Sequence, residues 1–91
     1  MTVTNVTQSI RDYIRRELMA DKQDAPLDDD ENLIDAGIVD SLGIFLVIAF
    51  IESEFAIKIQ PEDVVLENFA TINTIHRLIA RRQPNGSQVA P

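Results

Sequence analysis

The run of apolar side chains from Leu42 to Ile51 constrains this chain more than any other feature. Ten successive residues there carry no polar side chain, about half of the ~20 that a helix needs to cross a bilayer. The stretch 41–55 has the length of a helix, whereas a buried strand usually has about four to eight residues. Its β-branched and aromatic side chains would also suit a strand, but no partner strand is evident elsewhere. The pattern therefore predicts a helix, with Asp40 or Ser41 as its N-cap.

Three further segments have the spacing or the end signals of helices. Over 4–19, side chains four residues apart form one apolar face. Pro61, followed by two acids, begins a short helix over 61–66, and Thr71 caps a last helix over 71–82. The side chains expected to be buried by these helices are Val6, Ile10, Tyr13, Ile14, Leu18, Val64, Val65, Leu66, Ile72, Ile75, Leu78 and Ile79. The sequence predicts an all-α fold, a small four-helix bundle of three main helices and one short helix.

Two parts of the chain have no helical period. Residues 20–40 form a loop longer than most in compact domains, and its segment 21–31 holds six acids against one base. The apolar anchors expected in its second half are Leu33, Ile34 and Ile38. Residues 83–91 have too little apolar content to fold. We therefore expect one domain over 1–82 and a flexible C-terminal tail.

Composition excludes several classes of function. The net charge of −7 and the pI near 4.4 repel nucleic acid and anionic membranes and favour basic protein partners. Cysteine is absent, so there is no disulfide, cysteine nucleophile or thiolate metal site. The N-terminus lacks the basic and apolar pattern of a secretory signal. The expected location is the cytoplasm, and the expected state is a monomer.

The acidic loop does not match a calcium-binding loop. An EF-hand beginning at Asp28 would fit at Asp30 and Asn32. It would have Leu33 where the sharp turn needs glycine, and Val39 where the ion needs a bidentate glutamate. We therefore predict a solvated acidic loop and no metal site.

Ser41 does not match a hydrolase nucleophile either. It lies in V-D-S-L-G, which lacks the leading glycine of a nucleophile elbow. The single histidine, His76, lies in the last helix, where packing or a local hydrogen bond is the simpler role. We predict no catalytic residue, and hence no enzyme activity of the chain itself.

A bundle of this size cannot enclose one helix on all sides, so part of the apolar run must face outward. The helical phase leaves outside Leu42, Phe45 and Ala49. A contiguous apolar surface of this kind is typical of a partner-binding site. Asp40 and Ser41 lie at the helix N-terminus, where free backbone N–H groups favour a phosphate. The sequence thus predicts a serine able to carry a phosphodiester beside an apolar docking surface.

The segment G-I-V-D-S-L, from Gly37 to Leu42, resembles the modification motif of acyl and peptidyl carrier proteins. The similarity covers about residues 6–82. It includes L-I-D-A-G at the end of the acidic loop, E-S-E-F at the end of the second helix, and then I-x-P-E-D and F-A-T-I. D-S-L alone is a weak signal, but the whole set in this order and spacing is a strong one.

The resemblance implies that Ser41 is the attachment point of 4′-phosphopantetheine, installed from coenzyme A by a phosphopantetheinyl transferase with magnesium. Asp40 would assist through that magnesium ion in the transferase. The arm's thiol would hold acyl or aminoacyl cargo as a thioester, delivered by loading ligases or synthases. Partner docking is then assigned to Leu42, Phe45, Ala49, Ile38 and Val64.

Two departures from the family pattern bear on the pathway. Fatty-acid-synthesis carriers have acids on the outer face of the second helix, but here Gly43 and Leu46 stand where such acids are common. The stretch 59–71 also looks longer than in those carriers. These features favour a stand-alone carrier in a dedicated biosynthetic pathway, with more apolar docking.

Two expectations remain open at this point. Four large side chains could fill the interior and prevent sequestration of long acyl chains, namely Phe45, Phe50, Phe55 and Phe69. An alternative function is an unmodified helical interaction module that docks through the apolar surface of the second helix. The variant Ser41→Ala separates the two functions, because it abolishes a carrier but costs an adaptor only a helix cap.

Overall fold

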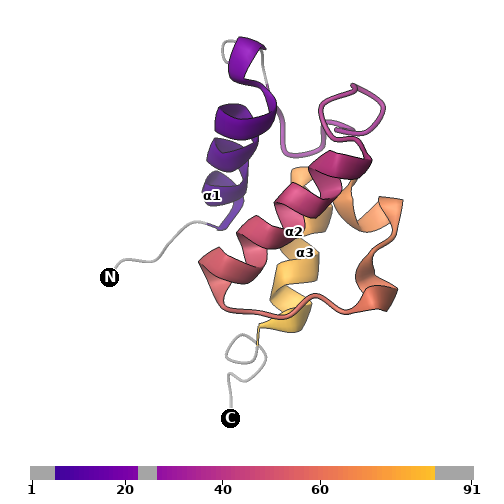
Figure 1. Ribbon diagram of the computed structural model, residues 1–91. Coiled ribbons are helices and arrows are strands. Elements are labelled where there is room, and N and C mark those ends of the chain that lie inside the picture. The colour runs from indigo at the N-terminus through magenta and orange to yellow at the C-terminus, as the bar shows by residue number, and fades with distance from the viewer. Residues whose placement is uncertain (1–5, 23–26, 84–91) are drawn as a thin grey trace.

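A computed structural model describes residues 6–22 and 27–83. These residues form three α-helices, α1 (Val6–Tyr13), α2 (Ser41–Phe55) and α3 (Ile72–Arg82), and contain no strand (Figure 1). A π-helical turn (Ile14–Leu18) extends α1, and shorter 3₁₀ turns lie at Ala20–Lys22, Pro61–Asp63 and Leu66–Phe69. The prediction of an all-α fold is confirmed. No helix in the described ranges is both long and apolar enough to cross a membrane.

Helix α2 has the bounds that the apolar run predicts. Asp40 is its N-cap, with extended backbone angles (φ −113°, ψ −167°). The helix ends at Ala56, whose backbone is left-handed (φ 54°, ψ 46°). Ile44, Val47 and Ile51 are its buried side chains, so only one side of this almost wholly apolar helix faces the core.

Helix α1 packs through its apolar face, as expected, but is not one continuous α-helix. Ile10 and Ile14 are fully buried, and Met19 N–H donates to Ile14 O at 3.0 Å, which closes the wider π-helical turn. Tyr13 stacks on Phe50 of α2, with 4.2 Å between ring centroids. Burial, and then the charge of Glu17, raise the pKa of Tyr13. The predicted helix start before Val6 lies outside the described residues.

The predicted short helix begins at Pro61 as expected, but its extent over 61–66 is corrected: short 3₁₀ turns accompany the three main helices in place of one continuous short helix. Pro61 begins only a three-residue 3₁₀ turn, and Val64 leaves helical geometry (φ −86°, ψ 74°). Asp63 accepts from Gln60 N–H, a contact that caps the start of this turn. A longer helix would have no buried apolar face, and most helical stability in proteins comes from packing such a face. The burial predicted for Val64, Val65 and Leu66 is also wrong, because all three are exposed.

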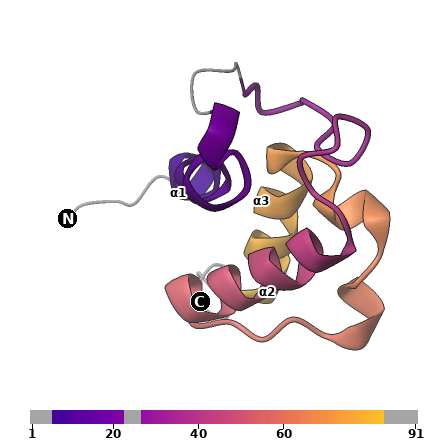
Figure 2. The same cartoon turned by 45° about the horizontal axis from the view of Figure 1, so that its top comes forward.

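Helix α3 supplies the centre of the core. Thr71 and Thr74 cap its start reciprocally, each backbone N–H donating to the other's Oγ1 at 3.0 Å. The four side chains predicted for its buried face are all fully buried: Ile72, Ile75, Leu78 and Ile79. Around them pack Ile10, Ile14, Met19, Leu27, Leu33, Val39, Ile44, Val47, Ile51, Ile57, Ile59 and Phe69. Both views place α3 beside α2, with the segment 57–70 on the side away from α1 (Figure 2).

The described part of the long loop is held by its apolar anchors and by short polar contacts. Leu33 is fully buried and its N–H donates to Ala70 O at 2.7 Å, while Ile34 and Ile38 are half-buried against the core. Gly37 has a positive φ of 76°, which suits the predicted turn. These contacts fix the path of the chain into Asp40. Gln83, the first residue of the expected flexible tail, ends α3, and its N–H donates to Ile79 O at 2.9 Å. The rest of that tail, 84–91, lies outside the described residues.

Candidate functional site

Ser41 is the first residue of α2 and its side chain is exposed. Asp40 Oδ1 accepts a hydrogen bond from Gly43 N–H at 2.8 Å, and Asp40 O accepts one from Ile44 N–H at 2.8 Å. The cap therefore comes from Asp40 and not from Ser41. The serine hydroxyl stays available at a helix end that favours an anionic group.

Gly43 lies buried directly beneath this cap. A Cβ atom at that position would lie 3.3 Å from Asp40 Oδ1, 3.5 Å from Val39 Cγ1 and 3.9 Å from Leu18 Cδ1. A larger side chain would press on the capping carboxylate, and an acid would bring a second negative charge to it. This packing gives a physical reason for glycine at position 43.

An apolar groove of about 420 Å³ opens beside the serine. It is lined by Ser41, Ile44 and Phe45 of α2 and by Val64, Val65 and Leu66 across from them. The last three residues form the groove wall, and Leu66 is 61% exposed. The structure thus brings the start of α2 beside a segment about twenty residues later in the chain.

The predicted docking residues occupy different environments. Leu42 and Phe45 are 66% and 63% exposed, and Ala49 and Val64 are also exposed. Ile38 differs, because it is half-buried against the core. Since Phe45 points outward, the expectation that it fills the interior is wrong; Phe69 is the fully buried phenylalanine.

Sequence reasoning missed part of this surface. Leu46, Val65 and Leu66 are exposed apolar side chains that extend it. Leu66 also borders a second cavity of about 220 Å³, whose lining includes the acids Asp35 and Glu67. One signal in the sequence could have indicated this surface: three successive apolar residues follow the turn that begins at Pro61. Three adjacent side chains cannot all lie on the single buried face of one short helix.

The residues considered for a calcium-binding loop and for a hydrolase site make ordinary structural contacts. His76 is exposed on α3, with its Nδ1 3.4 Å from Thr7 Oγ1, and does not line the groove beside Ser41. Asp29 pairs with Arg11, and Asp30 accepts a hydrogen bond from Asn73 at 2.7 Å. The acids of the loop thus tie it to α1 and α3.

Comparison with known proteins agrees with this arrangement of a short helical domain and an exposed serine at the start of α2. Residues 8–79 match the family described as "Phosphopantetheine attachment site". The chain is 37% identical over 70 residues to the D-alanyl carrier protein of Streptococcus uberis, an alignment that covers 77% of this chain and 85% of that protein. It is 38% identical over 68 residues to the D-alanyl carrier proteins of Streptococcus equi subsp. zooepidemicus and subsp. equi. Each of these alignments covers 75% of this chain and 82% of the relative.

The chain belongs to the family of phosphopantetheine-binding carrier proteins. Members are not catalysts; they carry a covalently attached 4′-phosphopantetheine. They work with phosphopantetheinyl transferases and with enzymes that load their cargo. The similarity to carriers named for a single cargo confirms the prediction of a carrier in a dedicated pathway rather than in fatty acid synthesis.

Proposed function

We propose that Ser41 carries the 4′-phosphopantetheine group through a phosphodiester on its Oγ. The proposal rests on the start of α2, where the Asp40 side chain caps the helix and Ser41 is exposed. In the transfer, Ser41 Oγ attacks the β-phosphorus of coenzyme A and loses its proton, and adenosine 3′,5′-bisphosphate leaves. The new phosphodiester lies near the positive end of the helix dipole, which stabilises its charge.

We propose that Asp40 assists this modification through the transferase's magnesium ion. Its Oδ1 is engaged by Gly43 N–H, so Oδ2 is the oxygen directed to a metal held by the partner enzyme. A carboxylate oxygen is the ligand type that magnesium prefers. The same side chain would thereby stabilise the helix start and orient the neighbouring hydroxyl toward the transferase.

The apolar surface around Ser41 is proposed as the docking site for the transferase and the loading enzymes. It combines the exposed side chains of Leu42, Phe45 and Ala49 with the groove wall beginning at Val64. We keep Ile38 in this set, although it is half-buried and packs against the core. Once attached, the prosthetic group supplies a thiol that holds cargo as a thioester at high effective concentration near each partner.

For the cargo, we propose an aminoacyl group, D-alanyl in the first instance. The support is the name shared by the relatives, D-alanyl carrier protein, at 37–38% identity. An adenylating ligase would load it, using ATP to activate the carboxylate before transfer to the arm's thiol. We further propose a monomer located in the cytoplasm, to be tested by light scattering and by cell fractionation.

The first experiment measures the intact mass before and after incubation with coenzyme A, magnesium and a broad-specificity phosphopantetheinyl transferase. We expect a gain of one phosphopantetheine in the wild type and in Ser53→Ala, a matched serine exposed on the same helix. Ser41→Ala should show no gain. A thiol titration adds a second readout, because the chain has no cysteine and should change from zero thiols to one. Modification of Ser41→Ala, or no gain in folded wild-type protein beside a working control carrier, would refute the assignment.

Cargo is then tested on the modified protein with ATP, D-alanine and a D-alanine-adenylating ligase. We expect one D-alanyl group per chain, released by hydroxylamine as a thioester should be. L-alanine serves as the stereochemical control, and the carrier from Streptococcus uberis serves as the positive control. Loading of that carrier without loading of this chain would exclude D-alanyl and leave the Ser41 assignment intact.

A further inference from the structure

The groove wall opposite Ser41 is a segment with little burial of its own. Val64, Val65 and Leu66 are 40%, 42% and 61% exposed, and the two residues before Leu66 lie between two short 3₁₀ turns. Exposed apolar side chains contribute little to holding a segment in place, since the hydrophobic effect acts only on surface removed from water. The wall is therefore held by the residues on either side of it, where polar contacts act together with the buried side chains of Ile59 and Phe69.

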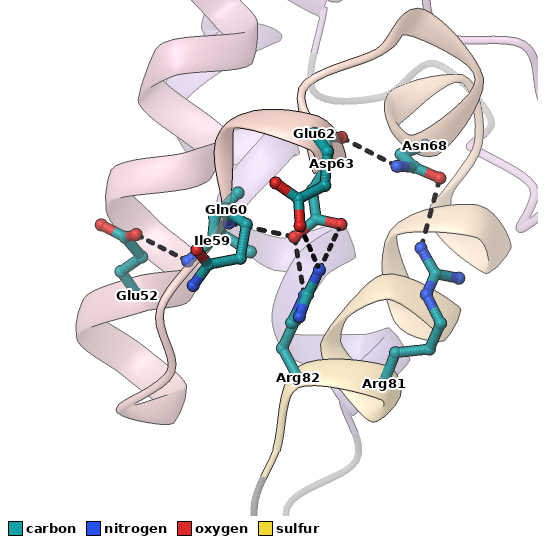
Figure 3. A network of polar contacts seen from close by, with 8 residues as sticks. All are labelled: Glu52, Ile59, Gln60, Glu62, Asp63, Asn68, Arg81 and Arg82. Carbon is teal, nitrogen blue, oxygen red and sulfur yellow. Dashed lines mark hydrogen bonds and ion pairs between the residues drawn. The ribbon is translucent and has the colours of Figure 1, made fainter.

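At the leading end, Asp63 forms a two-pronged ion pair with Arg82, near the end of α3 (Figure 3). Arg82 Nε donates to Asp63 Oδ2 at 2.7 Å, and Arg82 Nη2 donates to Asp63 Oδ1 at 2.9 Å. The Asp63 residue is only 5% exposed, and Oδ2 also accepts from Gln60 N–H at 3.0 Å. A paired arginine and carboxylate in this fork geometry fix orientation as well as distance.

At the trailing end, Asn68 continues the same network. Its Nδ2 donates to Asp63 O at 2.8 Å, and its Oδ1 accepts from Arg81 Nη2 at 3.4 Å. Further back, Glu52 of α2 accepts from Ile59 N–H at 2.9 Å. Figure 3 shows the contacts of Asp63 and Asn68 with the last turn of α3 as one network, with the separate Glu52–Ile59 contact joining α2 to the segment just before it.

We propose that Asp63 and Arg82 are positioning residues for the reactions at Ser41: their ion pair holds the groove wall at the place where partner enzymes contact it. This inference rests on the proposed function of Ser41 and of the groove beside it. Neither residue lines the groove, so both act through Val64, Val65 and Leu66. The last turn of α3 thereby becomes part of the docking geometry, although it lies outside the modification motif.

The test compares transferase kinetics of the wild type, Asp63→Asn and Arg82→Gln. A displaced wall weakens binding of the carrier but leaves the Ser41 hydroxyl unchanged, so we expect KM for the carrier to rise about three- to tenfold with kcat retained. Arg82→Lys keeps the charge but loses the fork and should give an intermediate KM. Methyl NMR signals of Val64, Val65 and Leu66 should shift in both variants. The matched control is Arg11→Gln, which breaks the Arg11–Asp29 pair that ties α1 to the loop.

The outcomes separate the two levels of the proposal. If wild-type protein gains no phosphopantetheine, the function proposed for Ser41 is wrong. If the wild type is modified while Asp63→Asn and Arg82→Gln keep its KM and its methyl signals, only the positioning role is wrong. An equal rise of KM in Arg11→Gln would also overturn that role, since it would reflect general loss of stability. If Arg82→Gln does not fold, the positioning role is tested with Arg82→Lys and Asp63→Asn, by the transferase KM and the methyl signals of the groove wall.

Discussion

The carboxylate of Asp40 and the backbone N–H of Gly43 are joined by a 2.8 Å hydrogen bond, and Gly43 is buried against that carboxylate. This relationship makes the start of α2 sensitive to the residue at position 43. A substitution at position 43 acts on the buried side of the cap, whereas one at Ser41 acts on an exposed residue, so the two effects can be measured separately.

Replacement of Gly43 by aspartate should destabilise the fold and impair modification. The new carboxylate would be buried beside Asp40, at a site where even a Cβ lies 3.3 Å from Oδ1. We expect a loss of about 3 kcal/mol in the free energy of unfolding, measured by urea denaturation. Gly43→Ala is the control, because the gain in helix propensity offsets the crowding to within about 1 kcal/mol. Equal stability of the two variants would contradict this account.

The Asp63–Arg82 pair should give stability a specific dependence on pH. The hydrogen bond from Arg82 holds the pKa of Asp63 below its ordinary value, against the opposing effect of burial. A lowered folded-state pKa means that the stabilisation is present above the unfolded pKa of about 4 and is lost as pH falls through the folded pKa.

Asp63→Asn should therefore cost about 1–2 kcal/mol at pH 7 and progressively less below about pH 4. Urea unfolding between pH 7 and pH 3 measures the difference from wild type. The exposed Asp28, changed to Asn, serves as control and should leave the profile near that of the wild type. A deficit of Asp63→Asn that stays constant down to pH 3 would show that the carboxylate charge is not what stabilises this turn.

Replacement of Ala56 by glycine should stabilise the fold. Its φ of 54° lies in the left-handed region, where a Cβ is unfavourable. Ala56→Gly should raise the free energy of unfolding by about 0.5–1 kcal/mol. Ala49→Gly, at an exposed position inside α2, should lower it by about 1 kcal/mol. Thermal unfolding of both variants checks the opposite signs, and a loss in both would contradict the conformational argument.

Phe45 and Phe69 should separate docking from folding. Phe45 is 63% exposed, so Phe45→Ala should change stability by less than about 1 kcal/mol but raise the transferase KM. Phe69 is fully buried, and Phe69→Ala should cost about 3–5 kcal/mol. Chemical denaturation gives the free energy of unfolding, and transferase kinetics on the same samples give KM. An unchanged KM in Phe45→Ala would remove this side chain from the docking surface.

Much of the fold follows from signals within a few residues of each other. The apolar run and the Asp40-Ser41 pair predicted α2 at its observed bounds. The cap at Thr71 and the four-residue spacing behind it predicted the buried face of α3. Ser41 could be chosen as the candidate site for the same reason, because a serine after a capping aspartate at a helix start is a local pattern.

The segment around Asp63 shows where local reasoning fails. Pro61 and two acids are a correct helix-start signal, but Asp63 is drawn inward by Arg82, nineteen residues later. The helical turn is only three residues long, and Val64 and its two successors are exposed. Pairing at such a distance depends on how α3 packs, which neither propensity nor periodicity encodes.

The sequence by itself therefore determined the helical class, the main helices and the serine at the start of α2, because caps and apolar periodicity act within one or two turns. Only the tertiary structure decided what surrounds that serine. The groove wall and the anchor at Arg82 both arise from packing between segments distant in the chain. The serine proposed for modification is thus specified by local sequence, whereas the groove beside it is set by the packing of the core.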